Sequence, residues 1–387
     1  MGVVAGTGVS RSLHAAEAGR EAAGAALRAL TGQAPALVVV YASPSLDLPA
    51  LLAAVRSVTG SALLVGATGA GATVRGEYLG FGGGVAVLAL TAGPYRFSAS
   101  SGAHIRGDLD GAGRTIVRGA REGAGPSPHA AVLVFCDALL GDLQQLMQGV
   151  YRIAGPRVPL VGAAAGDDQK FQHTSVFHDG RVVDEGAVAV WISSGVPLRA
   201  VSRHGWRPIG VPMLVTRAEG TEILELGGRS AAAVFGELLG LPPDGLPPAP
   251  FQQTARLHPF GLPQSDGSFV IRMARARTER GSLVIQGCVP QVGSAVQVME
   301  SSAEDLLSAA DEVGRAAVAA HPDPGVLLCF SCAARVPLLG GRAAEESRRL
   351  QAAAGTVPAF GLHGFSEFIR TAGVLATHNA TMTAMVL

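Results

Sequence analysis

Two charged side chains of this sequence stand inside apolar runs. Arg272 lies in "FVIRMA" and Glu367 lies in "GFSEF". Because a charged group among apolar neighbours is kept when it is paired, we expect Arg272 and Glu367 to line one cavity, with solvent exposure of Glu367 as the alternative. The planar guanidinium would hold a carboxylate, and Glu367 would accept from an ammonium. The pair therefore predicts a site for an amino acid or a small carboxylate.

Cys329 and Cys332 have the CxxC spacing of redox and zinc sites. A single pair lacks the second half of a zinc site, and Cys329 falls within an apolar strand, where a thiol is inert. Cys332 falls at the end of that strand with Arg335 close behind it, so we interpret it as a pocket-lining residue. No base accompanies it. We predict no catalytic residue, and an enzyme that uses Cys332 is the alternative.

Glycine-rich loops follow three apolar strands, and one of them, "VPLVGAAAGDDQK" at 158–170, ends in two aspartates. None has the spacing of a phosphate-binding loop or a dinucleotide fingerprint. Gly162 and Asp167 are nevertheless candidates for ligand binding, because α/β sheets bind ligands at the carboxyl ends of parallel strands. We predict no metal at Asp167 and Asp168, since aspartates in turns usually accept from their own backbone.

The ten histidines include no HExxH or comparable metal-binding spacing. His204, His363 and His378 fall at loop or strand ends. Hydrogen-bonded structural roles are favoured for them. Each could also supply the single axial imidazole that haem needs in an apolar cleft, so a haem is the alternative to a protein without cofactors.

Composition excludes several classes of protein. Thirty basic residues balance 30 acidic ones without a basic stripe, which argues against nucleic-acid binding. No apolar run reaches the 18 or so residues of a membrane span, and no signal peptide is visible. Four cysteines in 387 residues form no disulfide framework. We expect a cytoplasmic, compact protein.

One segment type occurs three times, starting at Pro35, Ala130 and Gly325. Each copy reads as strand, helix, strand and glycine loop; an alanine-rich helix precedes it and a closing strand follows it. This predicts an α/β fold whose mixed sheets are built from repeated α-β-α-β-loop-β units. Asp179 and Gly180 predict a two-residue hairpin turn. Three equivalent glycine loops could line one pocket.

The segment from about 200 to 298 departs from this unit. The proline density of "GLPPDGLPPAPFQ" at 240–252 predicts a linker without helix, and three strands are expected after it. We place the domain boundary there, with one part at 1–240, containing two repeat units, and the other at 241–387, containing the third.

Several stretches, in order along nearly the whole chain, resemble the FIST domain family with its N-terminal and C-terminal parts. They are "YASPSLDLPALL", "VPLVGAAAGDD", "HDGRVVDEGAVAV", "GWRPIGVPMLV", "FSCAAR" and "GFSEF...THNATMTAMVL". The resemblance implies a bacterial sensory module that binds small molecules such as amino acids. One branch is similar to haem-binding nitric-oxide sensors that regulate a partner histidine kinase. The following residues of this sequence stand at positions of the family's motifs: Gly162 and Asp167 of the glycine loop, Cys332, Arg335, Glu367, His378 and Asn379.

We therefore expect a non-catalytic sensor that binds an amino acid or small carboxylate between its two parts. The ligand-binding candidates are Arg272, Cys332, Arg335, Glu367, Asn379, Gly162 and Asp167. The expected partners are the ligand and a separate signalling protein such as a histidine kinase, and a homodimer is consistent with a stand-alone sensor. The alternatives are a haem-based gas sensor and an interaction protein without a small ligand.

Overall fold

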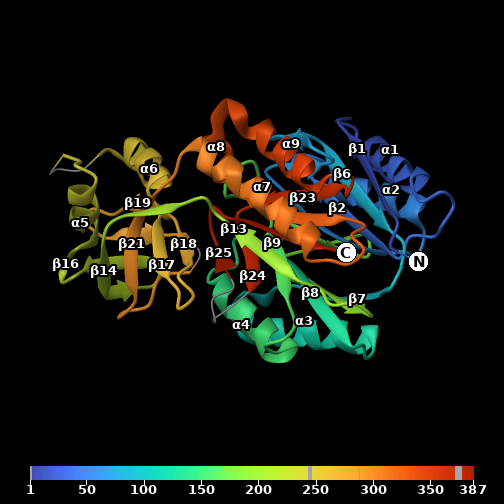
Figure 1. Ribbon diagram of the computed structural model, residues 1–387, viewed down its shortest axis with the longest axis horizontal. Coiled ribbons are helices and arrows are strands. Elements are labelled where there is room, and N and C mark those ends of the chain that lie inside the picture. Colours follow the sequence, from blue (N-terminus) through green and yellow to red (C-terminus); the bar gives the residue numbers. More distant parts are fainter. Residues whose placement is uncertain (1, 243–245, 287, 371–376) are drawn as a thin grey trace.

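A computed structural model describes residues 2–242, 246–286, 288–370 and 377–387. It is a mixed α/β structure with a body of three repeats and a smaller lobe that extends from it (Figure 1). This confirms the predicted fold class. Both chain ends lie on the side of the body away from the lobe (Figure 1).

The three repeats use the same order of elements. The first comprises β1 (Ala5–Ser10), α1 (Ala15–Arg28), β2 (Leu37–Ala42), α2 (Leu48–Thr59), β3 (Leu63–Thr68), β4 (Ala72–Val74), β5 (Glu77–Leu79) and β6 (Val85–Leu90). The second comprises β7 (Tyr95–Gly102), α3 (Leu109–Ala124), β8 (His129–Cys136), α4 (Leu143–Ala154), β9 (Leu160–Ala164), β10 (Val176–His178), β11 (Arg181–Val183) and β12 (Ala187–Ser194). The third comprises β13 (Ala200–Arg203), α7 (Ala303–Ala319), β22 (Leu327–Cys332), α8 (Arg335–Leu339), α9 (Ala343–Ala354), β23 (Ala359–Gly364), β24 (Ser366–Arg370), β25 (Thr377–His378) and β26 (Met382–Val386).

Each repeat builds one sheet but gives its hairpin to a neighbour. The sheet orders are β1-β6-β2-β3-β10-β11, β7-β12-β8-β9-β24-β25 and β13-β26-β22-β23-β4-β5. The hairpin of the second repeat thus completes the first sheet, that of the third completes the second, and that of the first completes the third. The predicted turn of one such hairpin is confirmed, because Asp179 and Gly180 have φ values of 48° and 79°.

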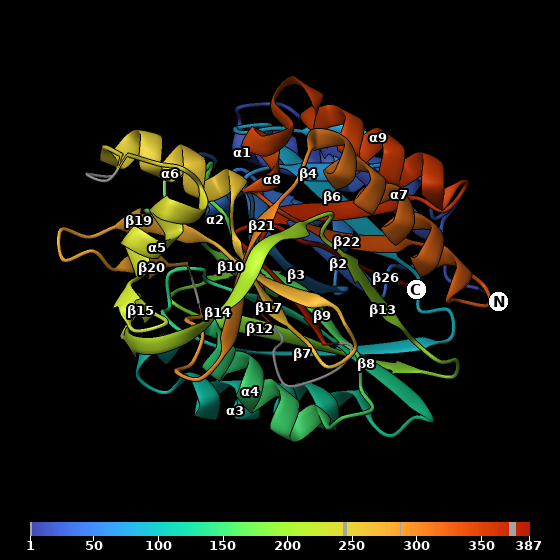
Figure 2. The ribbon, with the colours of Figure 1, turned by 60° about the vertical axis from the view of Figure 1, so that its left-hand side comes forward.

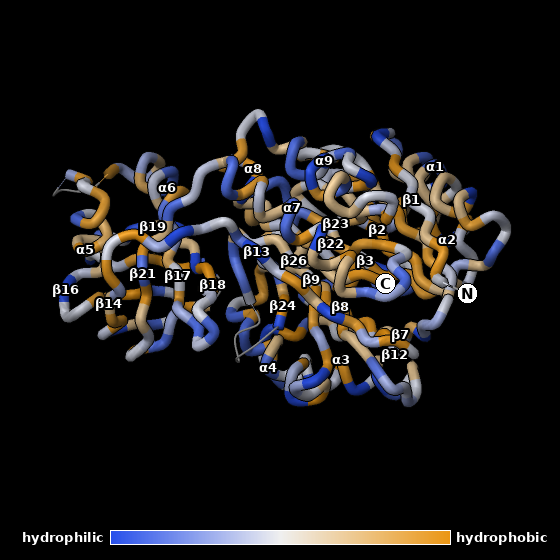
Figure 3. Tube along the Cα trace, in the orientation of Figure 1, coloured by the Kyte–Doolittle hydropathy of each residue, from blue (hydrophilic) through white to orange (hydrophobic). Residues whose placement is uncertain are grey.

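Helices cover the outer faces of these sheets in pairs. Figures 1 and 2 show α3 and α4 along one side of the body and α7 and α9 along the other. The central strands β2, β8 and β22 are buried at nearly every position and are hydrophobic in Figure 3, as expected for strands that are covered on both faces. Asp47 and Asp142 cap α2 and α4 through backbone N–H groups, so equivalent residues start equivalent helices.

The centre of the body is a cluster of four aromatic rings, one from the first repeat, one from the second and two from the third. Tyr41 and Phe135 lie 5.9 Å apart between ring centroids, Phe135 and Phe330 lie 6.0 Å apart, and Tyr41 stacks on Phe360 at 4.8 Å. All four are buried. The three repeats therefore share one core and are not separate domains.

The lobe is inserted between β13 and α7. It comprises β14 (Arg207–Glu219), β15 (Glu222–Leu226), β16 (Arg229–Ser230), α5 (Ala231–Leu238), α6 (Pro248–Leu257), β17 (Phe260–Pro263), β18 (Phe269–Arg272), β19 (Ala274–Arg277), β20 (Leu283–Ile285) and β21 (Ala295–Glu300). Its own core contains Phe235, Phe251 and Phe260. The proposed domain boundary at residue 240 falls inside this lobe.

The prediction that 240–252 excludes helix was wrong, because α6 begins at Pro248. Proline is accepted in the first turn of a helix, where the backbone N–H groups have no partner within the helix. Beyond α6 the lobe has more strands than the three expected, since β18 and β19 are separate.

A glycine at the same position of β3, β9 and β23 allows the parallel strands to approach. A Cβ on Gly66 would lie 1.9 Å from the Val40 carbonyl oxygen, and one on Gly162 would lie 1.9 Å from that of Val134. On Gly361 it would meet Cys329 Sγ at 2.1 Å. No side chain fits at these distances, so the repeat requires glycine there.

We expect Gly66→Ala to lower the free energy of unfolding by about 3 kcal/mol, because the added methyl group must push β2 and β3 apart. Urea denaturation of the variant measures this. Gly341→Ala is the matched control, since a Cβ at Gly341 meets no atom within 4 Å. Equal stability of the two variants would contradict the packing described.

Candidate functional site

A cavity of about 650 Å³ lies between the lobe and the body. The body contributes residues around the start of α4 together with Phe171, Phe365 and Ser366, and the lobe contributes residues of β17 to β20 and of the loop after β20. Its volume lies within the range of about 300–1,000 Å³ that is usual for ligand pockets.

Arg272 is the most buried charged group on the cavity wall, with 1% of its surface exposed. Its Nη1 atom donates to the carbonyl oxygens of Ile271, at 3.0 Å, and Thr377, at 2.7 Å. Its Nε and Nη2 atoms have no hydrogen-bond partner among the described residues. Burial lowers the pKa of Arg272 from its usual value. Both nitrogens are closed to solvent, and the group beside the guanidinium is the Cys288 thiol, a weak acceptor, so these two donors lack a strong acceptor.

Ser366 offers a further donor to the cavity. It is buried at the start of β24, and its Oγ atom accepts a hydrogen bond of 3.1 Å from Asn379 Nδ2. Because a hydroxyl can accept and donate at once, this bond leaves the Ser366 proton free for a ligand. Asn379 therefore acts behind the cavity wall, by orienting Ser366.

Asp142 brings a negative charge to the same cavity. It caps α4 through a bond of 3.0 Å from the Gln144 N–H to its Oδ1 atom. The Asp142 charge opposes the lowering of the Arg272 pKa. Arg275 adds an exposed positive charge to the wall. The cavity therefore presents groups of both signs.

Cys288 lies beside Arg272 on the wall of the cavity. Burial raises the pKa of this thiol, and the nearby Arg272 charge only partly offsets the rise. The thiol is therefore protonated at neutral pH, and a protonated thiol is a poor nucleophile.

Glu367 does not pair with Arg272, so that expectation was wrong. Ser366 faces the cavity, and because side chains alternate along a strand, Glu367 points away from it into the body. There Glu367 is fully buried, its Oε2 atom accepts from the Thr381 N–H at 3.2 Å, and its Oε1 atom has no hydrogen-bond partner among the described residues, with the Cys332 thiol close by. Burial raises the pKa of Glu367 well above its usual value.

Cys332 borders only a small hollow of about 30 Å³ beside Phe171 and Phe365. Burial and the neighbouring Glu367 raise the pKa of its thiol well above the usual value. The structure thus places Cys332 next to the cavity, but it does not line the cavity itself.

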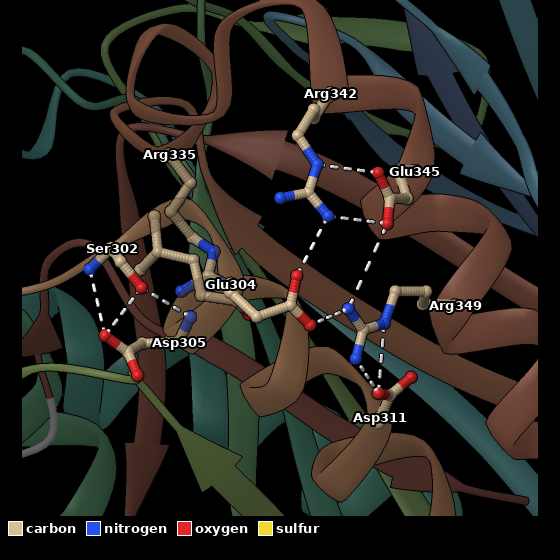
Figure 4. Close-up of polar contacts among 9 residues, drawn as sticks. Ser302, Glu304, Asp305, Asp311, Arg335, Arg342, Glu345 and Arg349 are labelled. Carbon is tan, nitrogen blue, oxygen red and sulfur yellow. Dashed lines mark hydrogen bonds and ion pairs between the residues drawn. The ribbon is translucent and has the colours of Figure 1, made fainter.

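Arg335 is buried like Arg272, but all its nitrogens are engaged. Nε donates to Glu346 Oε1 at 2.8 Å, Nη2 to the Leu306 carbonyl at 2.8 Å, and Nη1 to the His204 carbonyl at 3.1 Å. Figure 4 shows it beside a network in which Arg342, directly before α9, and Arg349 of α9 contact Glu304 and Asp311 of α7. Arg335 therefore binds the third repeat together and offers nothing to a ligand in this geometry.

The three glycine loops bind one another. The Ala70 N–H donates to the His363 carbonyl, that of Gly166 to Thr68 and that of Phe365 to Ala164, at 2.9, 2.9 and 3.1 Å. The loops thus close the centre of the body, and of the glycine-loop residues named here only Phe365 reaches the cavity.

Gly162 and Asp167 both lie within this closed region. Gly162 is part of β9, where its lack of a side chain admits β8. The Asp167 carboxylate accepts from the N–H groups of Phe171, Gln172 and His173 at 2.8, 2.6 and 2.8 Å. It therefore holds the loop that carries Phe171, as the turn interpretation predicts.

The three candidate histidines are in two places. His363 is buried, and its Nε2 atom lies 3.1 Å from Thr73 Oγ1. His204 and His378 line a second hollow of about 440 Å³, which is also bordered by Phe269 and Val270 of β18. Burial lowers the pKa of His204 to about 4 and that of His378 to about 3, so both imidazoles are neutral at pH 7.

Two further features can be reported for the described part of the chain. It holds no cluster of three or more histidine, cysteine, aspartate or glutamate residues that could bind a metal ion. None of its helices combines the length and apolar character needed to span a membrane.

Comparison with protein families gives two adjacent matches, which together cover most of the chain. The FIST N domain matches residues 36–229 and the FIST C domain matches residues 231–370. The chain belongs to the FIST domain family. FIST domains are associated with sensing in signal transduction. The junction between the two FIST domains falls within the lobe, at the end of β16.

Three uncharacterized proteins are similar to this FIST chain. One from Mycobacterium tuberculosis is 30% identical over 390 residues, covering 97% of each chain. One from Mycobacterium bovis is 31% identical over 237 residues, covering 58% of this chain and 59% of the relative. One from Methanocaldococcus jannaschii is 27% identical over 169 residues, covering 41% and 33%.

Sequence reasoning found Arg272 but missed Ser366, Asp142 and Cys288. Asp142 carried a usable signal, because it stands where Asp47 stands in the first repeat, directly before a helix that starts beside a strand end. Ser366 carries no comparable signal, because a serine beside a charged residue is common on strands. Its position before Glu367 on one strand decides which of the two faces the cavity.

The raised pKa of Glu367 makes stability depend on pH. Below its unfolded pKa of about 4.3 the neutral carboxyl stabilises the fold fully, and this contribution is lost as the pH rises through the folded pKa. Glu367→Gln stays neutral, so we expect its melting temperature relative to the unsubstituted protein to rise between pH 5 and pH 8. The gain in stability is at most about 1.4 kcal/mol for each pH unit.

Glu345→Gln is the control, because Glu345 is a half-buried partner of Arg342, and the hydrogen bond from Arg342 lowers the pKa of Glu345. Its difference from the unsubstituted protein should not rise with pH. A Glu367→Gln difference that is constant from pH 5 to pH 8 would show that the carboxyl is ionised throughout.

Proposed function

We propose that this protein is a non-catalytic sensory module that binds a small carboxylate, including amino acids, in the cavity between lobe and body. The observation that carries the proposal is the buried guanidinium of Arg272, which borders the cavity and keeps two donors, both closed to solvent, without partners among the described residues. A carboxylate satisfies both at once, because its two oxygens match the fork of a guanidinium.

The other polar groups suit this ligand. Ser366 can donate a third hydrogen bond to the carboxylate, and Asp142 can accept from an ammonium group if the ligand is an amino acid. Asp142 thus takes the role first assigned to Glu367. A ligand held in this way contacts both the lobe and the body.

A ligand that contacts both the lobe and the body gives a way for a partner protein to detect ligand binding. Only two chain segments, between β13 and β14 and between β21 and α7, connect the lobe to the body. A ligand that bridges them favours one relative position of the two parts. We propose that a separate signalling protein, such as a histidine kinase, reads this position, with the sensor acting alone or as a homodimer.

Catalysis is left out of the proposal because the cysteines near the cavity are poor nucleophiles. Burial raises the pKa of both Cys288 and Cys332. Labelling of either thiol by iodoacetamide faster than free cysteine would favour an enzyme instead.

We expect Arg272→Lys to weaken carboxylate binding at least about tenfold, because lysine keeps the charge but cannot form two parallel hydrogen bonds. Isothermal titration calorimetry against a panel of amino acids and simple carboxylates measures this. Arg217→Lys, in an exposed pair of the same lobe with Glu225, is the control. Full affinity in Arg272→Lys, or a panel without any binder, would contradict the proposal.

Asp142→Asn separates amino acids from other carboxylates. Asparagine still caps the helix but lacks the charge that attracts an ammonium. We expect this variant to lose affinity for amino acids about tenfold and to keep its affinity for simple carboxylates. Equal losses for both ligand types would mean that Asp142 does not contact the ammonium.

Haem is the second candidate, favoured by the neutral imidazoles of His204 and His378 in one hollow. The same hollow is bordered by Gln264, Ser265 and Asp266, whereas a haem needs an apolar cleft. The residues fit haem less well than the larger cavity fits a carboxylate. We expect protein expressed with added haem to be colourless; a Soret absorption band lost in His204→Ala or His378→Ala would reverse this ranking.

A further inference from the structure

We infer that the ligand of this cavity is an amphiphilic carboxylate, with an apolar body of several carbons attached to the acid group that Arg272 holds. The inference rests on the proposed function and adds the class of molecule. It comes from the apolar side chains that border the cavity away from Arg272, on both the lobe side and the body side, between polar groups that include Gln144, Gln148, Gln286 and Gln291.

The body contributes apolar groups from two places. Leu139 and Leu143 come from the loop before α4 and from its first residue, and Phe171 and Phe365 come from two of the strand-end loops. The two phenylalanine rings stack on each other with centroids 4.1 Å apart and planes at 12°. They form a fixed apolar surface, because the Asp167 carboxylate holds the loop that carries Phe171.

The lobe contributes the facing wall. Leu262 of β17, Val284 and Ile285 of β20, and Val289 and Pro290 of the following loop all border the cavity. No charged side chain is found among these five. The charged groups of the cavity come from Asp142, Arg272 and Arg275. Its hydroxyl and amide groups come from Thr221, Ser294, Ser366, Gln144, Gln148, Gln286 and Gln291.

The volume of the cavity favours an amphiphilic carboxylate over the smallest amino acids. A volume of about 650 Å³ is in the range that holds a drug-sized ligand. Acetate or glycine would satisfy Arg272 but leave most of the apolar walls in contact with water. A ligand with an apolar body removes that surface from water, and each buried methylene adds to the affinity.

The polar end of the cavity at Arg272 and the apolar side chains farther from it therefore set two different requirements for one ligand. The donors of Arg272 and Ser366 require an anionic oxygen pair, and the apolar walls require a hydrocarbon portion that reaches both lobe and body. A medium-chain or aryl-substituted acid meets both demands. An uncharged sugar does not meet the first demand, because it has no anionic oxygen pair for Arg272.

A series of straight-chain acids tests this. We use butanoate, hexanoate and octanoate as probes by calorimetry on the full-length protein, below their micelle-forming concentrations, with 1-octanol as the probe without a carboxylate. The dissociation constant should fall about fifteenfold for each added pair of methylenes, from about 0.8 kcal/mol per buried CH₂. Octanol should bind at least about tenfold more weakly than octanoate.

A pair of variants locates the apolar body. Val289→Trp adds volume to the lobe wall, so it should weaken octanoate at least about tenfold and leave butanoate within about twofold. Val292→Trp is the matched control, because Val292 lies on the same loop, is 60% exposed and does not border the cavity. It should change neither affinity. Melting curves of both variants without ligand exclude a general loss of the fold.

The outcomes distinguish this inference from the proposed function. Affinity that is independent of chain length, yet lost in Arg272→Lys, overturns the inference and leaves the proposed carboxylate site standing. Octanol that binds as tightly as octanoate, with no effect of Arg272→Lys, overturns both. An octanoate affinity that Val289→Trp and Val292→Trp lower equally also overturns the inference, since the chain then lies elsewhere.

Discussion

The exchange of hairpins among the three repeats is the constraint on which the rest of the structure depends. No repeat completes its own sheet, because β4–β5, β10–β11 and β24–β25 each pair with the second parallel strand of a neighbouring repeat. The strand-end loops must therefore cross close to one another, and they do so by donating backbone hydrogen bonds from one repeat to the next. The cluster around Tyr41, Phe135 and Phe330 fills the space enclosed. The three sheets form one cooperative body.

The same exchange determines where the cavity lies. Because β24 and β25 of the third repeat join the sheet of the second, Ser366 and Thr377 come to lie beside the start of α4. The lobe replaces the short connections at 11–14 and 103–108 of the other two repeats. It places Arg272 against the Thr377 carbonyl. The second repeat, the third repeat and the lobe thus all contribute to one cavity.

The sequence predicts the repeated units well, because each element is encoded locally by apolar periodicity, turn residues and helix caps. Asp179 and Gly180 are an example of a turn that is fixed by its own two residues. The exchange of hairpins could not be predicted in this way, since it concerns which distant strands pair. The error over Glu367 has the same origin. Its burial follows from its apolar neighbours in the sequence, but its hydrogen-bond partner, the Thr381 N–H instead of Arg272, depends on which face of β24 meets the lobe. The prediction of no helix at 240–252 was wrong for a local reason: proline breaks the interior of a helix but is accepted in its first turn, where Pro248 lies.

Arg335 and Arg272 illustrate how a structural arginine differs from one left for a ligand. Both are fully buried, but every nitrogen of Arg335 has a protein partner, whereas two nitrogens of Arg272 have none among the described residues. A crystal structure of the protein with its tightest-binding carboxylate tests this difference directly. The account predicts carboxylate oxygens about 2.8 Å from Nε and Nη2 of Arg272, with the remainder of the ligand between lobe and body. A ligand bound elsewhere, with Arg272 paired to a protein group, would contradict it.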